Sequence, residues 1–183
     1  RLGDFYEMFF DDAKLVSQEL DLVLTGRSAG VEEKVPMCGV PFHTANSYIS
    51  RLVKKGYKVA ICEQLEDPKA AKGIVKRDLT QIISKGTILD NESLNELENN
   101  YIGAIIDFNH VYSICYSDIS TGIIYVSLLE HNNLKLVNEI VSIGIKEVLV
   151  SDKLDKMIVS LLKNQFKLTV SISDNIVEQE EYK

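Results

Sequence analysis

The apolar and polar residues of this chain follow two different periods, and their arrangement changes midway along the sequence. In the first half, apolar positions recur every three or four residues over 11–20, which predicts a helix with one buried side. Similar spacing predicts a second helix over 44–55, with Thr44 as its N-cap and Gly56 as its stop. Extended segments, bounded by glycine, proline or polar residues, are predicted at 35–43, 57–63 and 75–84.

The second half has the pattern of a meander followed by crossover units. Three strands at hairpin spacing are predicted at 101–107, 111–118 and 122–129. They are followed by a helix, a strand, a helix and a strand at 135–142, 146–150, 154–164 and 166–172. The order β-β-β-α-β-α-β is that of ribonuclease H-like domains, an analogy of fold that implies no activity.

A polar stretch separates the two patterns and predicts a linker over residues 91–100. We therefore expect an α/β protein with a mixed-sheet module over 1–90 and a ribonuclease H-like domain over 101–183, truncated at its end. A length of 183 residues is sufficient for two small cores. Because the chain begins with Arg1 and not with Met, we expect a fragment whose true N-terminus is unseen.

The charge is distributed unevenly between these halves. The net charge is −7, with 13 Lys+Arg against 14 Asp+Glu in residues 1–92 and 7 against 13 in residues 93–183. A contact with a polyanion is therefore expected in the first half, on one face. Three cysteines without a C-x-x-C pair favour a reducing cytosol over a disulfide framework or a zinc site. No apolar run approaches the roughly 20 residues that span a membrane.

The candidate chemistry of the first half lies at its start, where Phe5 stands two residues before Glu7. Asp4 is a good N-cap residue, and Glu7 follows three positions later, which is the spacing of a capping box. This interpretation places Phe5 and Glu7 in the first turn of a helix, where side chains project outward. A purely structural alternative remains open, in which Glu7 closes the capping box and Phe5 packs beneath a loop.

Six segments, taken in order, resemble the MutS family of bacterial DNA mismatch-repair proteins over essentially the whole chain. They are GDFYEMFFDDA at 3–13, LVLT at 22–25, VPMCGVPFH at 35–43, VAICEQ at 59–64, KGIVKR at 72–77 and DISTG at 118–122. The resemblance implies that residues 1 to about 90 form most of a mismatch-recognition domain and residues from about 100 form most of a connector domain. Lys85 departs from the family pattern, which usually has a proline there, and the family's strand before Arg1 is absent.

In that family a Phe-x-Glu motif reads the mismatch, and it maps onto Phe5 and Glu7. A ring wedged between base steps from the minor groove costs least where the stack is already weakened by a mispair. We expect Glu7 to bind a base edge, partly in its protonated form. Intact base pairs offer no such hydrogen bond and leave only the repulsion between the carboxylate and the phosphates.

The resemblance implies further DNA contacts. Arg77 and Lys72 are expected to reach sugar-phosphate or the groove, while Arg27 and His43 stand where the family touches DNA. Met37 is a candidate for apolar lining near the wedge. For Arg27 and His43 a solvated loop position is an equal alternative, and for Met37 plain core packing is the alternative.

The resemblance also implies functions outside this chain. No Gly-x-x-x-x-Gly-Lys-[Ser/Thr] occurs here, so this chain is expected to be no enzyme and to bind no cofactor. The longer protein is expected to be a cytoplasmic, nucleoid-associated homodimer that binds ATP and Mg²⁺. Its connector domain is expected to contact a MutL-like partner and to transmit mismatch binding to the ATPase clamp.

Two other classes of protein stay open. A metal-dependent nuclease would need carboxylates such as Asp107, Glu139 and Asp152 to bind two metal ions, although each also fits a turn, a solvated helix face or a cap. A pure interaction module would use the acidic second half, in which Asp118 and Gly122 fit a hairpin turn.

Overall fold

The computed structural model describes residues 1–28, 30, 34–66, 71, 73–88 and 99–174. The chain divides into two compact units, Arg1–Ser84 and Lys85–Lys183. No helix within the described ranges is long and apolar enough to cross a membrane.

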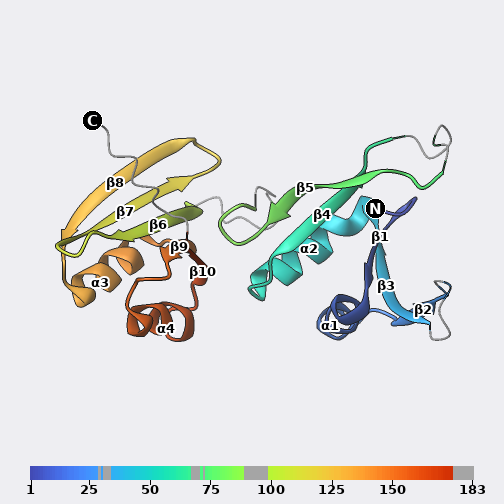
Figure 1. Cartoon of the computed structure of the whole chain (residues 1–183), viewed down its shortest axis with the longest axis horizontal. Helices are drawn as coiled ribbons and strands as arrows, with labels where there is room; N and C mark the ends of the chain where they lie inside the picture. The colour runs from blue at the N-terminus through green and yellow to red at the C-terminus, as the bar shows by residue number, and fades with distance from the viewer. Residues whose placement is uncertain (29, 31–33, 67–70, 72, 89–98, 175–183) are drawn as a thin grey trace. The chain divides into compact units, whose positions relative to one another are not determined.

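The first unit contains two small antiparallel sheets and two helices (Figure 1). One sheet has the order β1-β3-β2, and the other pairs β4 with β5. In chain order the elements are β1 Phe5–Phe9, α1 Phe10–Leu20, β2 Thr25–Arg27, β3 Val35–Pro41, the short 3₁₀ helix η1 Phe42–Thr44, α2 Ala45–Lys54, β4 Val59–Gln64 and β5 Arg77–Ile83.

The core of this unit forms where α1 packs against the inner face of β3. Ala13, Val16 and Leu20 of α1 are buried with Cys38 of β3 and Leu52 of α2. The predicted stripe on the first helix is therefore confirmed at these three positions. Burial also raises the pKa of the Cys38 thiol, whose Sγ lies 3.4 Å from the Ala13 carbonyl oxygen.

The predicted capping box is wrong. Residues 5–9 form a strand, α1 begins at Phe10, and the N-cap is Phe9, which makes no side-chain cap hydrogen bond. Asp4 lies in the turn before β1, and Phe9 belongs to the strand. The local signal fails because β1 pairs with β3 over five residues, from Phe5 opposite Pro41 to Phe9 opposite Met37.

The second unit is a five-stranded sheet with the order β10-β9-β6-β7-β8 (Figure 1). The strands β6, β7 and β8 form an antiparallel meander, whereas β9 and β10 run parallel to β6. The elements are β6 Tyr101–Asp107, β7 Val111–Asp118, β8 Ile123–Glu130, α3 Asn133–Ile143, β9 Glu147–Ser151, α4 Lys156–Asn164 and β10 Thr169–Ser173.

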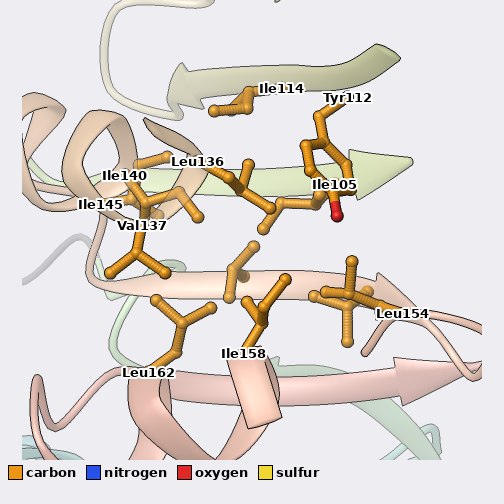
Figure 2. Packing of buried hydrophobic residues seen from close by; sticks show 12 residues of the cluster. Ile105, Tyr112, Ile114, Leu136, Val137, Ile140, Ile145, Leu154, Ile158 and Leu162 are labelled. Carbon is orange, nitrogen blue, oxygen red and sulfur yellow. The ribbon is translucent and has the colours of Figure 1, made fainter. Parts of the chain in front are cut away.

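Both helices of this unit contribute to one apolar core against the sheet. Figure 2 shows Leu136 and Ile140 of α3, with Ile158 of α4, directed toward Ile105 and Ile114 of the central strands. All five side chains are at most 3% exposed. The predicted element order is confirmed throughout this unit, and β6 and β7 have the predicted bounds.

The helix caps differ in part from the prediction. Asn132 caps α3 and accepts from the Lys135 amide at 3.0 Å, while Asp155 caps α4 and accepts from the Met157 amide at 2.8 Å. Thr44 precedes α2, but its hydroxyl donates backward to the Pro41 carbonyl oxygen and not to the helix. Most of the predicted linker, residues 91–98, lies outside the described residues.

Candidate nucleic-acid interface

Strand alternation places Phe5 and Glu7 on one face of the β1-β3-β2 sheet. In the antiparallel register Phe5 lies opposite Pro41, and Glu7 lies opposite Gly39. The alternate residues of the strand, Tyr6 and Met8, point to the other face, where Met8 packs against the core of the unit. The two candidate mismatch-reading residues therefore share a face that α1 does not cover.

Phe5 is the exposed aromatic of this face. The residue is 45% accessible, although transfer of a phenyl ring out of water is favourable. It stands at the start of β1, after a turn in which the Phe5 amide donates to the Leu2 carbonyl oxygen at 3.2 Å. An exposed ring on a hydrogen-bonded strand is held in a defined direction, which suits insertion into a stack.

Glu7 forms an ion pair with Arg27 of β2. The Arg27 Nη1 lies 3.1 Å from the Glu7 Oε2, and the two side chains are 54% and 17% exposed, respectively. Because β3 lies between β1 and β2, this ion pair crosses the central strand. Both residues stand out in the sequence, but their contact cannot be predicted from local spacing, since 20 positions separate them.

Gly39 makes room for the Glu7 side chain on this face. A Cβ atom at Gly39 would lie 3.4 Å from the Glu7 Cγ and 3.2 Å from the Tyr6 carbonyl oxygen. Any larger residue would therefore crowd the Tyr6 carbonyl oxygen and come into contact with Glu7, its partner in the strand register. The sequence signal for this role is the glycine inside an otherwise apolar strand.

Tyr6 supports β1 from the opposite side of the strand. Its hydroxyl donates to Glu63 of β4, which links the β1-β3-β2 sheet to the β4-β5 hairpin. Burial, together with this hydrogen bond, raises the pKa of Tyr6 to about 12.

Met37 and His43 lie on or near the same sheet. Met37 of β3 is partly buried between Phe9 and Thr25, so its side chain shares the face that carries Phe5 and Glu7. His43 is exposed in η1, two residues after the Pro41 that pairs with Phe5. Its ring meets Phe42 edge-on, with 5.9 Å between the ring centroids.

Arg77 is held by the backbone of its own unit. Its Nε donates to the Arg1 carbonyl oxygen at 2.9 Å, and its Nη1 donates to the Val75 carbonyl oxygen at 3.0 Å. These bonds orient the guanidinium at the start of β5. Lys72, the other residue predicted to contact the sugar-phosphate backbone of DNA, lies outside the described residues.

A pocket of about 450 Å³ opens on the core side of β1. Its lining is mainly apolar and includes Met8, Val16, Tyr48, Leu52, Val59 and Ile61. Glu7 also contributes to its lining, whereas Phe5 does not.

The carboxylates of the nuclease alternative do not form a metal site. Asp107 accepts from the Asn109 amide at 2.7 Å and lies 3.1 Å from the His131 Nε2, Glu139 is on α3, and Asp152 follows β9. Among the residues that the structure describes, no three His, Cys, Asp or Glu side chains are grouped so that they could hold a metal ion.

Family models match both halves of the chain. The family model of MutS domain I matches residues 1–92, and the family model of MutS domain II matches residues 100–182. The chain therefore belongs to the MutS family of DNA mismatch-repair proteins.

The DNA mismatch repair protein MutS of Bacillus licheniformis is 50% identical over 98% of this chain, and that of Bacillus subtilis is 49% identical over 98%. The Listeria monocytogenes protein of the same name is 47% identical over 95%. The chain spans about a fifth of the length of these curated relatives: 20%, 21% and 20%, respectively.

Proposed function

We propose that this chain recognises mismatched or unpaired bases in duplex DNA, and that the Phe5 and Glu7 face of the β1-β3-β2 sheet is its reading surface. The observation that carries the proposal is one exposed aromatic ring beside one carboxylate on a strand whose register fixes both directions. Membership of a mismatch-repair family supports the same interpretation.

In this proposal Phe5 detects a weakened base stack. Insertion of the ring from the minor groove unstacks one base step and kinks the duplex, at a cost of a few kcal/mol. The cost is smallest where a mispair or an unpaired base has already weakened stacking. Phe5 therefore reads mechanical weakness and not a particular sequence, which suits a protein that must act on many different errors.

Glu7 tests the base that Phe5 displaces. Its carboxylate binds the exposed edge of a mispaired base, whereas the edges of an intact pair are already satisfied. On intact duplex the carboxylate finds no base edge to bind, and the part of its negative charge that is not compensated is repelled by the phosphates, which lowers affinity for normal DNA.

The remaining candidates position the duplex. We assign Arg77 and Lys72 to sugar-phosphate, Arg27 and His43 to the edge of the reading face, and Met37 to the apolar lining near the wedge. Support comes from the shared sheet face of Met37 and Phe5, from the backbone bonds that orient Arg77, and from the exposure of His43.

We assign a different role to each of the two units. We assign residues 1–90 to mismatch recognition, 91–100 to a linker and 101–183 to a connector domain of the ribonuclease H type without nuclease function. The strand order β8-β7-β6-β9-β10, a meander followed by two parallel strands, supports that topology. In the longer relatives the connector would transmit mismatch binding to an ATPase clamp that uses ATP and Mg²⁺. We propose that the longer protein is a cytoplasmic homodimer that works on nucleoid DNA. Its connector domain would contact a MutL-like partner.

A comparison of two duplexes tests the proposal. Fluorescence anisotropy at low salt would measure the affinity of the 183-residue chain for a duplex with one G·T mismatch and for its matched twin. The same measurement would be made on Bacillus subtilis MutS in which this chain replaces the matching segment. Tighter binding of the mismatch by the chimaera supports the proposal, and equal affinity for the two duplexes contradicts it.

A further inference from the structure

The reading face contains a feature that the wedge mechanism does not require: an arginine paired with the carboxylate of Glu7. Arg27 reaches Glu7 across the central strand β3, with 3.1 Å between Nη1 and Oε2. The Glu7 side chain is only 17% exposed, whereas the Arg27 side chain is 54% exposed. The carboxylate is therefore the sheltered partner, and the guanidinium is the more exposed one.

The strand register makes this crossing possible. Glu7 lies opposite Gly39, and Arg27 lies opposite Val35, so both side chains leave the sheet on the face that carries Phe5. Gly39 has no side chain that could separate them, and a Cβ there would lie 3.4 Å from the Glu7 Cγ. The ion pair is thus a product of three strands and not of a local turn.

The ion pair also has an electrostatic consequence for DNA binding. A carboxylate that meets phosphates alone is repelled, but a carboxylate that keeps a guanidinium at 3.1 Å presents almost no net charge. For Glu7 to bind a base edge, it must exchange Arg27 for that base. Arg27 is then free to bind a phosphate, the anion that its planar guanidinium recognises well.

We propose that Arg27 is a positioning residue that holds and neutralises Glu7 in the DNA-free protein and on matched duplex, and that a mismatch releases it to a phosphate. The proposal rests on the proposed function of Glu7 and adds a regulation of the same site. Arg27 therefore sets the size of the preference for mismatched DNA, because it moderates the penalty that normal duplex meets.

Substitution of Arg27 by glutamine tests this exchange. Arg27→Gln uncovers the repelled Glu7 charge on matched duplex, whereas on a mismatch Glu7 still binds its base and only the phosphate contact of Arg27 is lost. Affinity for matched duplex is expected to fall more than affinity for mismatched duplex. The ratio of the two affinities should rise about threefold, the change expected when a partly exposed ion pair is lost.

The combination with Glu7→Gln distinguishes positioning from simple phosphate binding. In the Glu7→Gln background Arg27 has no carboxylate to hold, so Arg27→Gln should weaken both duplexes equally and leave their ratio unchanged. The matched control is Arg51→Gln, which removes one positive charge from exposed surface on α2. The control should leave the ratio unchanged in both backgrounds.

The outcomes separate the two proposals. A wild-type chimaera that binds both duplexes equally defeats the proposed function. A clear mismatch preference that Arg27→Gln leaves unchanged or lowers defeats the role of Arg27 alone. The ion pair can also be tested without DNA, by NMR. The Arg27 Nε–Hε resonance should shift in the Glu7→Gln variant, and an unmoved resonance would overturn the role proposed for Arg27.

Discussion

At the residue scale, the exposure of Phe5 is the feature with the largest consequence. Its ring stays 45% accessible on a strand whose alternate residues, Tyr6 and Met8, are directed toward the interior. The free energy that burial of this ring would contribute is therefore available to a binding partner. The proposed partner is a base step with weakened stacking.

Phe5→Ala should abolish mismatch preference while weak, salt-sensitive duplex binding remains. Stacking of one base on an aromatic ring is worth about 1–3 kcal/mol, so the ratio of mismatched to matched affinity should fall roughly tenfold. Anisotropy at two salt concentrations measures both effects. Phe108→Ala, which removes a ring with 46% exposure from the second unit, is the control and should leave the ratio intact. Equal loss of affinity for both duplexes would refute the wedge.

At the element scale, the turn between β7 and β8 is organised by one buried carboxylate. Asp118 is 7% exposed. Its carboxylate accepts hydrogen bonds from the Ser120 hydroxyl at 2.6 Å, from the Ser120 backbone N–H at 2.9 Å and from the Asn100 backbone N–H at 2.8 Å. The hydrogen bond from the Ser120 side chain, with that from the Asn100 amide, lowers the pKa of Asp118. The sequence predicts a hairpin turn at this residue but not the hydrogen bonds that its carboxylate accepts.

Asp118→Asn should destabilise the second unit by roughly 2 kcal/mol, because one acceptor oxygen becomes a donor that faces other donors. The pKa of Asp118 is lowered in the folded state, so its contribution is complete above about pH 4 and is lost as the pH falls further. Urea unfolding at pH 7 and pH 3 measures this difference. The gap between wild type and variant should shrink at pH 3, and a gap that is constant with pH would contradict the argument.

At the scale of the whole molecule, the two units have separate cores. One cluster contains Ala13, Val16, Leu20, Cys38 and Leu52, all from the first unit, and the other draws its buried residues from positions 105–162. The charges are separated as well, since most of the excess of acidic residues lies in residues 93–183. The excess of negative charge in the second part makes the first part the better match for the proposed contact with a polyanion.

Ile140→Ala should therefore lower the free energy of unfolding of the second unit by about 3 kcal/mol and leave the first unit unchanged. Ile140 is fully buried in the core that Figure 2 shows. Hydrogen exchange resolved by residue should show faster exchange in β6 and β9 and no change in α1. Leu134→Ala, on the same helix but 69% exposed, is the matched control. Faster exchange in α1 would show that the units unfold together.

The sequence alone determined most of the second unit, because its elements are defined by local periods and turns. Two of its strands were predicted with their observed bounds, and the β-β-β-α-β-α-β order was predicted in full. In the first unit the buried stripe of α1 followed from helical spacing for the same reason. The residue types of the reading site, Phe5 and Glu7, were also visible, since their motif is local.

Only the tertiary structure decided how those residues are presented. The capping-box spacing favoured a helix at Asp4–Glu7, but pairing with β3, some 30 residues later, makes residues 5–9 a strand. The same pairing brings Glu7 opposite Gly39 and within 3.1 Å of Arg27. Local spacing cannot predict such contacts, because hydrogen bonds between distant strands outweigh the weak local preferences of the residues that form them.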